Sequence, residues 1–158
     1  MKMRLAITML LLVSAAWAQK YNGPRPPKPD IPYLMHADNL EETEAVEARE
    51  EARKDDVTYW VAGGSSPART PLAGPIFLVQ AEKLNVERIQ LYQFTVKNNR
   101  REVFFSKKKP KDSARALRLS IDRLDEGLYR LEVYDSLENG EYSLTPDGSN
   151  QVFCFQVY

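Results

Sequence analysis

The chain is 158 residues long and carries 22 Lys and Arg against 22 Asp and Glu, with a single His. This length suits one ordinary domain with an appended segment, and the balanced charge argues against a general nucleic-acid binder, which shows a basic excess on one face. Cys154 is the sole cysteine. No disulfide can form within the chain, so an apolar core must hold the fold together.

Residues 1–18 have the three parts of an export signal. Basic residues supply the positive start, Leu5–Val13 the short apolar run, and Ala16–Ala18 the small-x-small cleavage site. A transmembrane anchor needs about twenty apolar residues, whereas polar sequence follows this run at once. The pattern predicts cleavage before Gln19 and a periplasmic or extracellular protein that is soluble after cleavage.

The segment from residue 19 to residue 38 is rich in proline. Proline fixes φ and lacks a backbone donor, so the sequence predicts an extended, semi-rigid arm here. His36 lies in this arm. A catalytic base must be held by the fold beside its nucleophile, and zinc needs three or four ligands, so neither role is expected of His36.

A charged helix is predicted over residues 39–55. An Asp or Asn cap is followed by Glu at the capping-box spacing. Glutamates crowd the first half, and Arg49, Arg53 and Lys54 lie toward the end, which complements the helix dipole. The apolar stripe is narrow, so the helix is expected to be solvent-exposed or lightly docked. An acidic face that recruits a basic partner is the alternative.

Residues 57–158 consist of short β-branched and aromatic runs separated by turn residues, the pattern of an all-β domain. About eight strands in about a hundred residues is the density of a β-sandwich. Asn98-Asn99 and residues 146–150 supply hairpin-type turns. The predicted strands are 57–62, 76–80, 89–96, 101–106, 116–121, 128–134, 141–145 and 151–157.

An L-x-x-G-x-Y-x-L pattern occurs twice, beginning at Leu124 and at Leu137. In each copy the glycine can take the positive φ of a turn, and the tyrosine hydroxyl can bond the backbone. The first copy resembles the tyrosine-corner stretch of immunoglobulin-like domains, with Leu131 where those domains have a cysteine. The resemblance implies an immunoglobulin-like antiparallel β-sandwich of about 7–8 strands, preceded by the proline-rich arm and one helix. It implies nothing about function.

The end of the chain is similar to the close of small exported bacterial proteins of unassigned activity. The similarity rests on residues 139–144 and 150–155, together with residues 31–34 and 66–72. It suggests a bacterial source and attaches no functional residue.

A lysine-rich loop is the one concentrated charge feature of the β region. Its potential would attract a phosphate-rich envelope surface, an acidic polysaccharide or an acidic protein face. The alternative is a solubility device that guards a neighbouring strand. The predicted ligand-binding residues are Lys107, Lys108, Lys109 and Lys111. No catalytic residue, metal ligand or cofactor site is predicted.

Other polar groups carry weaker hypotheses. Asp122, Asp125 and Glu126 form a carboxylate cluster, but they flank a predicted turn, whereas glycosidase carboxyls face each other about 5–10 Å apart. Residues 69–70, in a proline-marked loop, could meet a partner or simply connect two strands. Aromatic residues in the strands must in part build the core, and any outward ones could form a sugar-stacking platform.

Cys154 lies in an aromatic strand and is expected to be a buried core thiol, with an intermolecular disulfide or a reactive thiol as the alternatives. The leading hypothesis is a non-catalytic interaction or structural module of the bacterial cell envelope, which binds an envelope protein or an anionic surface polymer and no nucleic acid. One rival is a carbohydrate-binding module or weak glycoside hydrolase. Another is a subunit that assembles by strand addition at residues 151–158.

Overall fold

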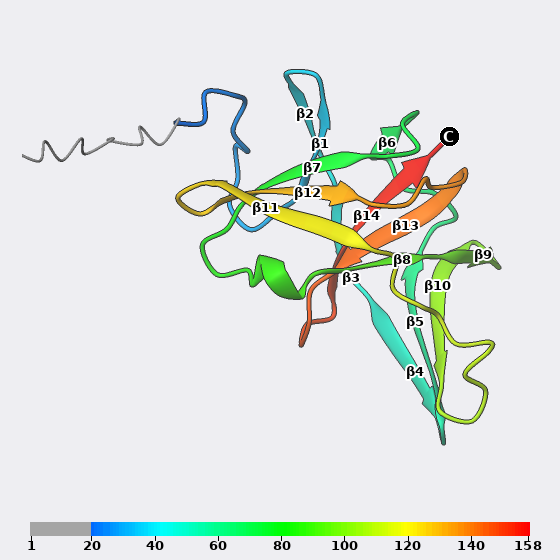
Figure 1. Cartoon of the computed structure of the whole chain (residues 1–158). Coiled ribbons are helices and arrows are strands. Elements are labelled where there is room, and N and C mark those ends of the chain that lie inside the picture. Colours follow the sequence, from blue (N-terminus) through cyan, green and yellow to red (C-terminus); the bar gives the residue numbers. More distant parts are fainter. Residues whose placement is uncertain (1–19) are drawn as a thin grey trace, which may run out of the picture.

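The computed structural model describes residues 20–158, so the export signal predicted at residues 1–18 lies outside the described residues. The described chain folds into three antiparallel sheets, with one short 3-10 helix at Val86–Arg88 (Figure 1). The predicted all-β, sandwich-like class is confirmed. No helix within residues 20–158 has the length and hydrophobicity needed to span a membrane.

Each sheet is named here by its strand order: sheet A is β11-β12-β7-β1-β2, sheet B is β3-β14-β13-β8 and sheet C is β4-β5-β10-β9. The two-residue β6 adds to sheet B by pairing in parallel with β14. The strands are β1 Tyr33–His36, β2 Asn39–Glu42, β3 Glu44–Glu47, β4 Arg49–Arg53, β5 Asp56–Ala62, β6 Arg69–Thr70, β7 Ile76–Gln80, β8 Gln90–Gln93, β9 Thr95–Lys97, β10 Arg100–Ser106, β11 Leu119–Asp125, β12 Leu128–Val133, β13 Gly140–Thr145 and β14 Gln151–Val157.

Sheet B is the middle layer and has apolar side chains on both faces. Along β14, Phe153 and Phe155 pack toward sheet A, in one apolar cluster with Phe77 of β7. The alternate residues Val152 and Cys154 belong to a second cluster, shared with sheet C. Successive side chains of β14 point to opposite faces of sheet B, and another sheet covers each face. Apolar residues therefore follow one another along almost the whole strand. The prediction of a buried thiol is confirmed, because Cys154 is fully buried.

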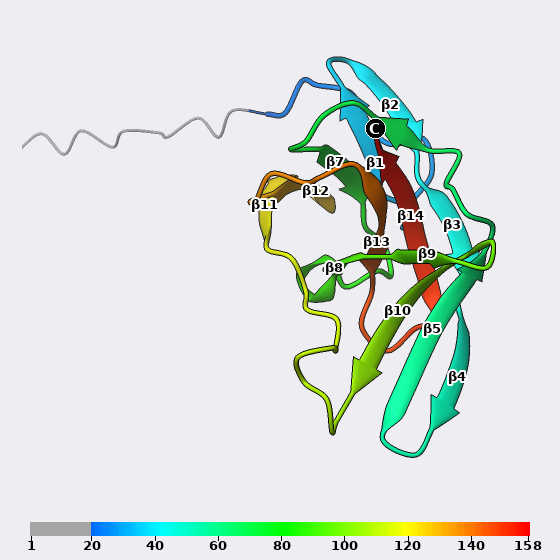
Figure 2. The same cartoon turned by 90° about the vertical axis from the view of Figure 1, so that its right-hand side faces the viewer.

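Two segments pass from sheet B into sheet C without a loop. β3 continues through Ala48 into β4, and β8 continues through Phe94 into β9 (Figure 2). The Ala48 N–H donates to the Asn150 carbonyl at 2.7 Å, and the Phe94 N–H donates to the Glu141 carbonyl at 2.8 Å. Strands that bend from one sheet into another form the corners of orthogonally packed sheets. Sheets B and C therefore enclose a shared interior.

The helix predicted over residues 39–55 is wrong, because this segment forms β2, β3 and β4. Val46 and Ala48 pack in the interior between sheets B and C. β3 pairs with β14 near the end of the chain, and β4 pairs with β5 in a local hairpin. These strand pairings override the helix propensity of Glu and Ala. β4 is an exposed edge strand with charged residues of both signs, which disfavours pairing with other chains.

Residues 20–32 lie against sheet A. Arg25 forms an ion pair with Asp125 at the end of β11. The Asp30 N–H donates to the Gln80 carbonyl at 2.8 Å, and its carboxylate accepts three backbone N–H groups just after β7. The segment has no helix or strand before Tyr33, as its prolines predict. The sheets begin at Tyr33, so the β domain starts well before the predicted boundary at residue 57.

The turns show one predicted hairpin and some of the features expected of the repeated L-x-x-G-x-Y-x-L pattern. Asn98 and Asn99 have φ of 51° and 53° and join β9 to β10, which confirms the predicted hairpin. In the first copy Gly127 has φ of 65°. In the second copy the Tyr142 hydroxyl donates to the Glu138 carbonyl at 2.7 Å. Each copy thus uses a different part of the shared pattern.

Candidate functional site

The lysine loop follows β10 and lies beside the turn between β4 and β5. The Lys107 N–H donates to the Asp55 carbonyl at 3.0 Å, and the Lys108 ammonium lies 2.7 Å from the Asp55 carboxylate. The Lys109 N–H donates to the Ser106 hydroxyl at 3.0 Å. These contacts hold the start of the loop against the end of sheet C, and all four predicted lysines remain exposed.

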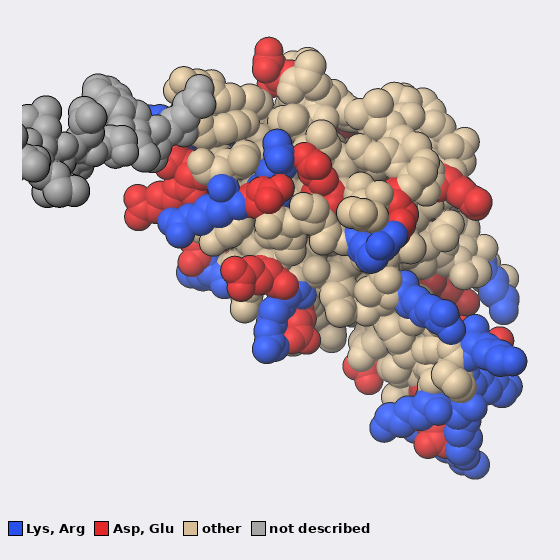
Figure 3. Space-filling model, viewed as in Figure 1, with Lys and Arg blue, Asp and Glu red and all other residues tan. Residues whose placement is uncertain are grey.

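The same turn contributes two further cations that the sequence had assigned to the end of a helix. Arg53 and Lys54 are exposed, and Lys54 has φ of 50° in the tight connection. We call the combined surface the basic tip; it consists of Arg53, Lys54, Lys107, Lys108, Lys109 and Lys111. Figure 3 shows Lys and Arg gathering over the free ends of β4, β5 and β10.

Three carboxylates accompany the six cations of the basic tip. Asp55 forms an ion pair with Lys108, and Asp56 accepts a hydrogen bond from the Ser106 hydroxyl at 2.6 Å. Asp112 lies farther along the loop. Cations therefore outnumber carboxylates at this end of the molecule, and the local potential is positive although the whole chain is formally neutral.

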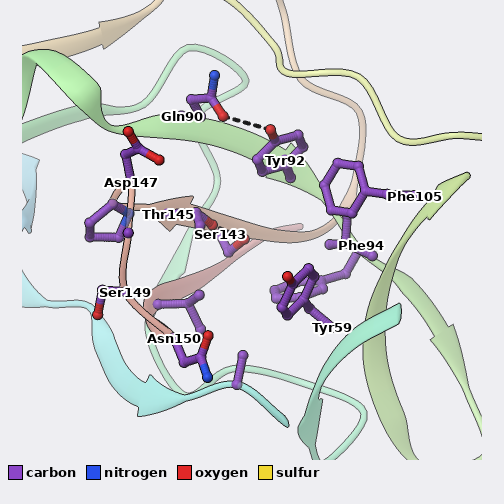
Figure 4. Close-up of a pocket in the computed structure, with 15 residues that line it drawn as sticks. Tyr59, Gln90, Tyr92, Phe94, Phe105, Ser143, Thr145, Asp147, Ser149 and Asn150 are labelled. Atoms are coloured by element: carbon purple, nitrogen blue, oxygen red, sulfur yellow. Dashed lines mark hydrogen bonds between the residues drawn. The ribbon is translucent and has the colours of Figure 1, made fainter. Parts of the chain in front are cut away.

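A cavity of about 270 Å³ opens between sheets B and C (Figure 4). Aromatic rings from both sheets form its walls, and the β13–β14 loop, residues 146–150, borders it. Its residues alternate along each strand because every second side chain points to the shared interior. The rings are Tyr59, Tyr92, Phe94 and Phe105. We call this cavity the aromatic pocket.

The rings of the aromatic pocket meet edge to face. The centroids of Tyr92 and Phe105 are 5.4 Å apart with an interplanar angle of 89°, and those of Tyr59 and Phe105 are 6.1 Å apart at 72°. Such T-shaped pairs stabilise the walls beyond simple burial. Burial raises the pKa of the Tyr92 hydroxyl, and burial together with Glu50 raises that of Tyr59. Both phenols are therefore neutral at pH 7.

Polar groups in the aromatic pocket already pair with one another. The Tyr92 hydroxyl donates to the Gln90 amide oxygen at 2.7 Å, and the hydroxyls of Ser143 and Thr145 are 3.1 Å apart. Asp147, in the bordering loop, forms an ion pair with Arg88 at 2.7 Å. The pocket therefore presents hydroxyl and amide groups with no unpaired charge among its described lining residues.

The opposite end of the shared interior is closed by a buried ion cluster. Arg101 is 1% exposed and binds the Glu44 carboxylate through both terminal nitrogens, at 2.6 and 3.1 Å. It also donates to the carbonyls of Ala62 and Gly63, each at 3.0 Å. Glu141 lies 3.9 Å from the same guanidinium. Arg101 and Phe105 share the inward face of β10, so the strand runs from this cluster to the pocket.

Cys154 and His36 are not placed for catalysis. Burial raises the pKa of the Cys154 thiol to about 12, so the reactive thiolate is rare at neutral pH. The Nε2 atom of His36 lies 2.9 Å from the Thr70 hydroxyl, and neither residue lines the aromatic pocket. In the part of the chain that the structure describes, no three His, Cys, Asp or Glu side chains are arranged to hold a metal ion.

The carboxylates considered for hydrolysis lie on sheet A, whereas the aromatic pocket lies between sheets B and C. Asp122 pairs with Arg130, and Asp125 pairs with Arg25. Glu126 is exposed in the turn after β11. The structure therefore does not bring the carboxylate cluster to the aromatic rings, and no hydrolytic pair is assembled there.

Two segments that the sequence suggested as partner contacts instead pair with other strands of the same chain. β14 is hydrogen-bonded to β13 on one side and to β3 and β6 on the other, so strand addition at residues 151–158 is wrong. Residues 69–70 form β6, where the Arg69 Nε donates to the Gln156 amide oxygen at 2.6 Å.

Comparisons of the chain with known protein families, with curated proteins and with solved structures find no match.

Proposed function

We propose that the protein is an exported interaction module of the bacterial cell envelope, without a catalytic role, that docks an anionic partner through the basic tip. The observation that carries the proposal is the joining of two distant chain segments by Asp55. Its carbonyl and carboxylate bind Lys107 and Lys108, so the lysine loop and the Arg53-Lys54 turn present their cations together. Loops held on a rigid sheet are common binding surfaces.

The charge of the basic tip favours an anionic partner of extended form. Each Lys or Arg near an anionic membrane surface contributes about 1 kcal/mol of attraction, which falls off within a Debye length. The cations lie at the projecting end of sheet C, where a polymer or a broad acidic face can approach several of them at once (Figure 3). An anionic surface polymer and an acidic face of an envelope protein both have this chemistry.

The proposed location in the bacterial cell envelope rests on the sequence. Export rests on the signal pattern of residues 1–18, and the bacterial source rests on the resemblance at the chain end. An immunoglobulin-like strand arrangement stays a prediction, and the proposed function does not depend on it.

The test is binding of the purified protein to immobilised alginate, poly-L-glutamate and phosphatidylglycerol vesicles across a range of salt concentrations. We expect binding to at least one of these polyanions, with an affinity that falls as salt rises. Alanine at Lys107, Lys108, Lys109 and Lys111 is expected to weaken binding and flatten its salt dependence.

The matched control removes the same charge from exposed positions elsewhere, as alanine at Lys20, Lys83, Lys97 and Arg123. This control is expected to retain most of the affinity of the original protein. Equal losses in the two variants would show that net charge alone drives binding, and the absence of binding to all three polyanions would also overturn the proposal.

A further inference from the structure

We infer that the aromatic pocket is a subsite for one uncharged sugar ring. This site is separate from the cations of the basic tip, and its ligand chemistry follows from the size, wall geometry, hydrogen-bonding capacity and charge of the pocket. Each of these four properties narrows the class of ligand.

The size of the aromatic pocket limits its occupant to a single ring. Sites for drug-sized ligands occupy about 300–1,000 Å³, and this cavity, at about 270 Å³, is smaller than that range. It lies at the open end of the interior shared by sheets B and C, while the Arg101 cluster closes the other end. A ring carried on a longer molecule can therefore enter from one side only.

The walls suit a molecule with both apolar faces and polar edges. Tyr92 and Tyr59 stand at 89° and 72° to Phe105, so a ring that stacks on one aromatic face meets the edge or face of another. Ser149 and Asn150 lie in the loop that borders the pocket (Figure 4). A sugar ring has C–H groups on its faces and hydroxyls around its edge, which matches this division.

The hydrogen-bonding groups of the pocket need polar partners from a ligand. A hydroxyl has one donor proton and two acceptor lone pairs. The Tyr92 hydroxyl donates to Gln90, and one of the Ser143 and Thr145 hydroxyls donates to the other, which leaves the proton of the second hydroxyl free. The pocket therefore has both donors and acceptors free, because the side-chain amides of Gln90 and Asn150 add N–H groups and lone pairs. Sugar hydroxyls can both donate to and accept from these groups, whereas a purely apolar group leaves them without partners.

The charge of the pocket selects a neutral ring. Asp147 is paired with Arg88, and the other polar lining side chains are hydroxyls and amides. The basic tip lies at the same end of sheet C, because Tyr59 and Phe105 occupy the strands that lead to its two segments. A neutral ring in the pocket therefore leaves the tip free for anionic groups.

The test is a nuclear magnetic resonance titration of the backbone amides with maltotriose, cellotriose, mannotriose and the trimer of N-acetylglucosamine. We expect one or more of these neutral sugars to shift the amide signals of Gly148, Ser149 and Asn150. Tyr92→Ala should weaken that binding about tenfold, equivalent to about 1.4 kcal/mol. Tyr92→Phe keeps the ring and loses only the hydroxyl, so its loss should be smaller.

The matched control is Tyr134→Ala, which removes a ring that is 71% exposed and stacks on Arg118, away from the pocket. It should leave sugar binding unchanged, as should alanine at the four loop lysines. The inference is overturned if no trisaccharide shifts these amides, if Tyr134→Ala weakens binding as much as Tyr92→Ala, or if the neutral apolar probe 1-N-phenylnaphthylamine binds the pocket and the sugars do not. Loss of polyanion binding in the lysine variant reports on the proposed function separately.

Discussion

Arg101 and Glu44 form a bidentate ion pair that ties sheet C to sheet B in the interior of the protein. The guanidinium nitrogens lie 2.6 and 3.1 Å from the two carboxylate oxygens, and Arg101 is almost fully buried. Glu141 lies beside the same guanidinium at 3.9 Å. Arg101 thus neutralises carboxylates on β3 and β13 of sheet B, and it is the central cation of the buried cluster.

Arg101→Met is expected to destabilise the protein strongly. Removing one partner of a buried ion pair leaves the other charge unpaired and typically costs about 3–5 kcal/mol. Urea unfolding followed by circular dichroism measures the free energy of unfolding. The neighbouring Arg100→Met is the control, because Arg100 pairs with Glu51 at the surface and should have a much smaller effect. Equal losses for the two variants would show that Arg101 has no special structural role.

Asp30→Asn is expected to make stability less sensitive to acid. Burial acts to raise the pKa of Asp30, but the N–H groups of Leu84, Glu82 and Lys83 outweigh it and hold the pKa below its usual value. The stabilisation is therefore present above the unfolded pKa, near 3.9, and is lost as pH falls through the lower folded value. Asparagine keeps an acceptor oxygen without this titration.

Thermal unfolding of both proteins between about pH 2 and pH 7 measures this difference. The original protein should lose more of its melting temperature than the variant in the acid range. Parallel curves throughout that range would contradict the role given to Asp30. Asp38→Asn is the control, because Asp38 is exposed in the β1–β2 turn.

Cys154 is expected to resist thiol reagents in the folded protein. With a pKa of about 12, the thiolate is about one part in ten thousand at pH 8, and the side chain is fully buried. Reaction with dithionitrobenzoate should be very slow in buffer and complete in urea. Rapid reaction in buffer, or a reducible dimer on a non-reducing gel, would contradict this placement.

Several strands after residue 57 are predictable because their β-branched and aromatic runs lie between turn residues with strong signals. Ile76–Gln80 and Gln151–Val157 form strands with the predicted bounds. Asn98-Asn99 forms the predicted hairpin, since asparagine tolerates positive φ in both central positions. These elements depend on local chemistry that the sequence displays directly.

Residues 39–55 are mispredicted because their structure depends on pairing with other strands, one of which, β14, lies far away in the sequence. Glu and Ala favour a helix locally, but Ala45 pairs with Phe153 and Glu50 with Tyr59 in antiparallel ladders. A period-two signal was present, since Glu44, Val46 and Ala48 all face the interior. It was weak because only one of the three is a large apolar residue.

The basic tip and the aromatic pocket also differ in how much of each site the sequence reveals. The lysine loop is visible in the sequence as a run of charge, but its union with Arg53 and Lys54 depends on the hairpin that replaces the predicted helix. The aromatic pocket depends on the strand bends at Ala48 and Phe94. Neither bend carries a glycine or proline signal that would reveal it.

Gly127→Ala is expected to destabilise the β11–β12 turn more than Gly148→Ala destabilises the β13–β14 turn. Both glycines have positive φ, 65° and 72°, so each substitution costs about 1–2 kcal/mol of backbone strain. An added Cβ at Gly127 would also lie 3.0 Å from the Ala81 carbonyl oxygen, whereas nothing lies within 4 Å at Gly148. Urea unfolding of the two variants measures the difference, and equal losses would exclude a steric contribution at Gly127.

The most direct test of the basic tip compares alanine at Arg53 and Lys54 with alanine at Lys107 and Lys109 in binding to the polyanion that the original protein binds best. If the two segments form one site, each pair should weaken binding by a similar factor, up to about thirtyfold for two cations at about 1 kcal/mol each. The same affinity for the Arg53 and Lys54 variant as for the original protein would contradict a joint site and leave the lysine loop as an isolated charged segment.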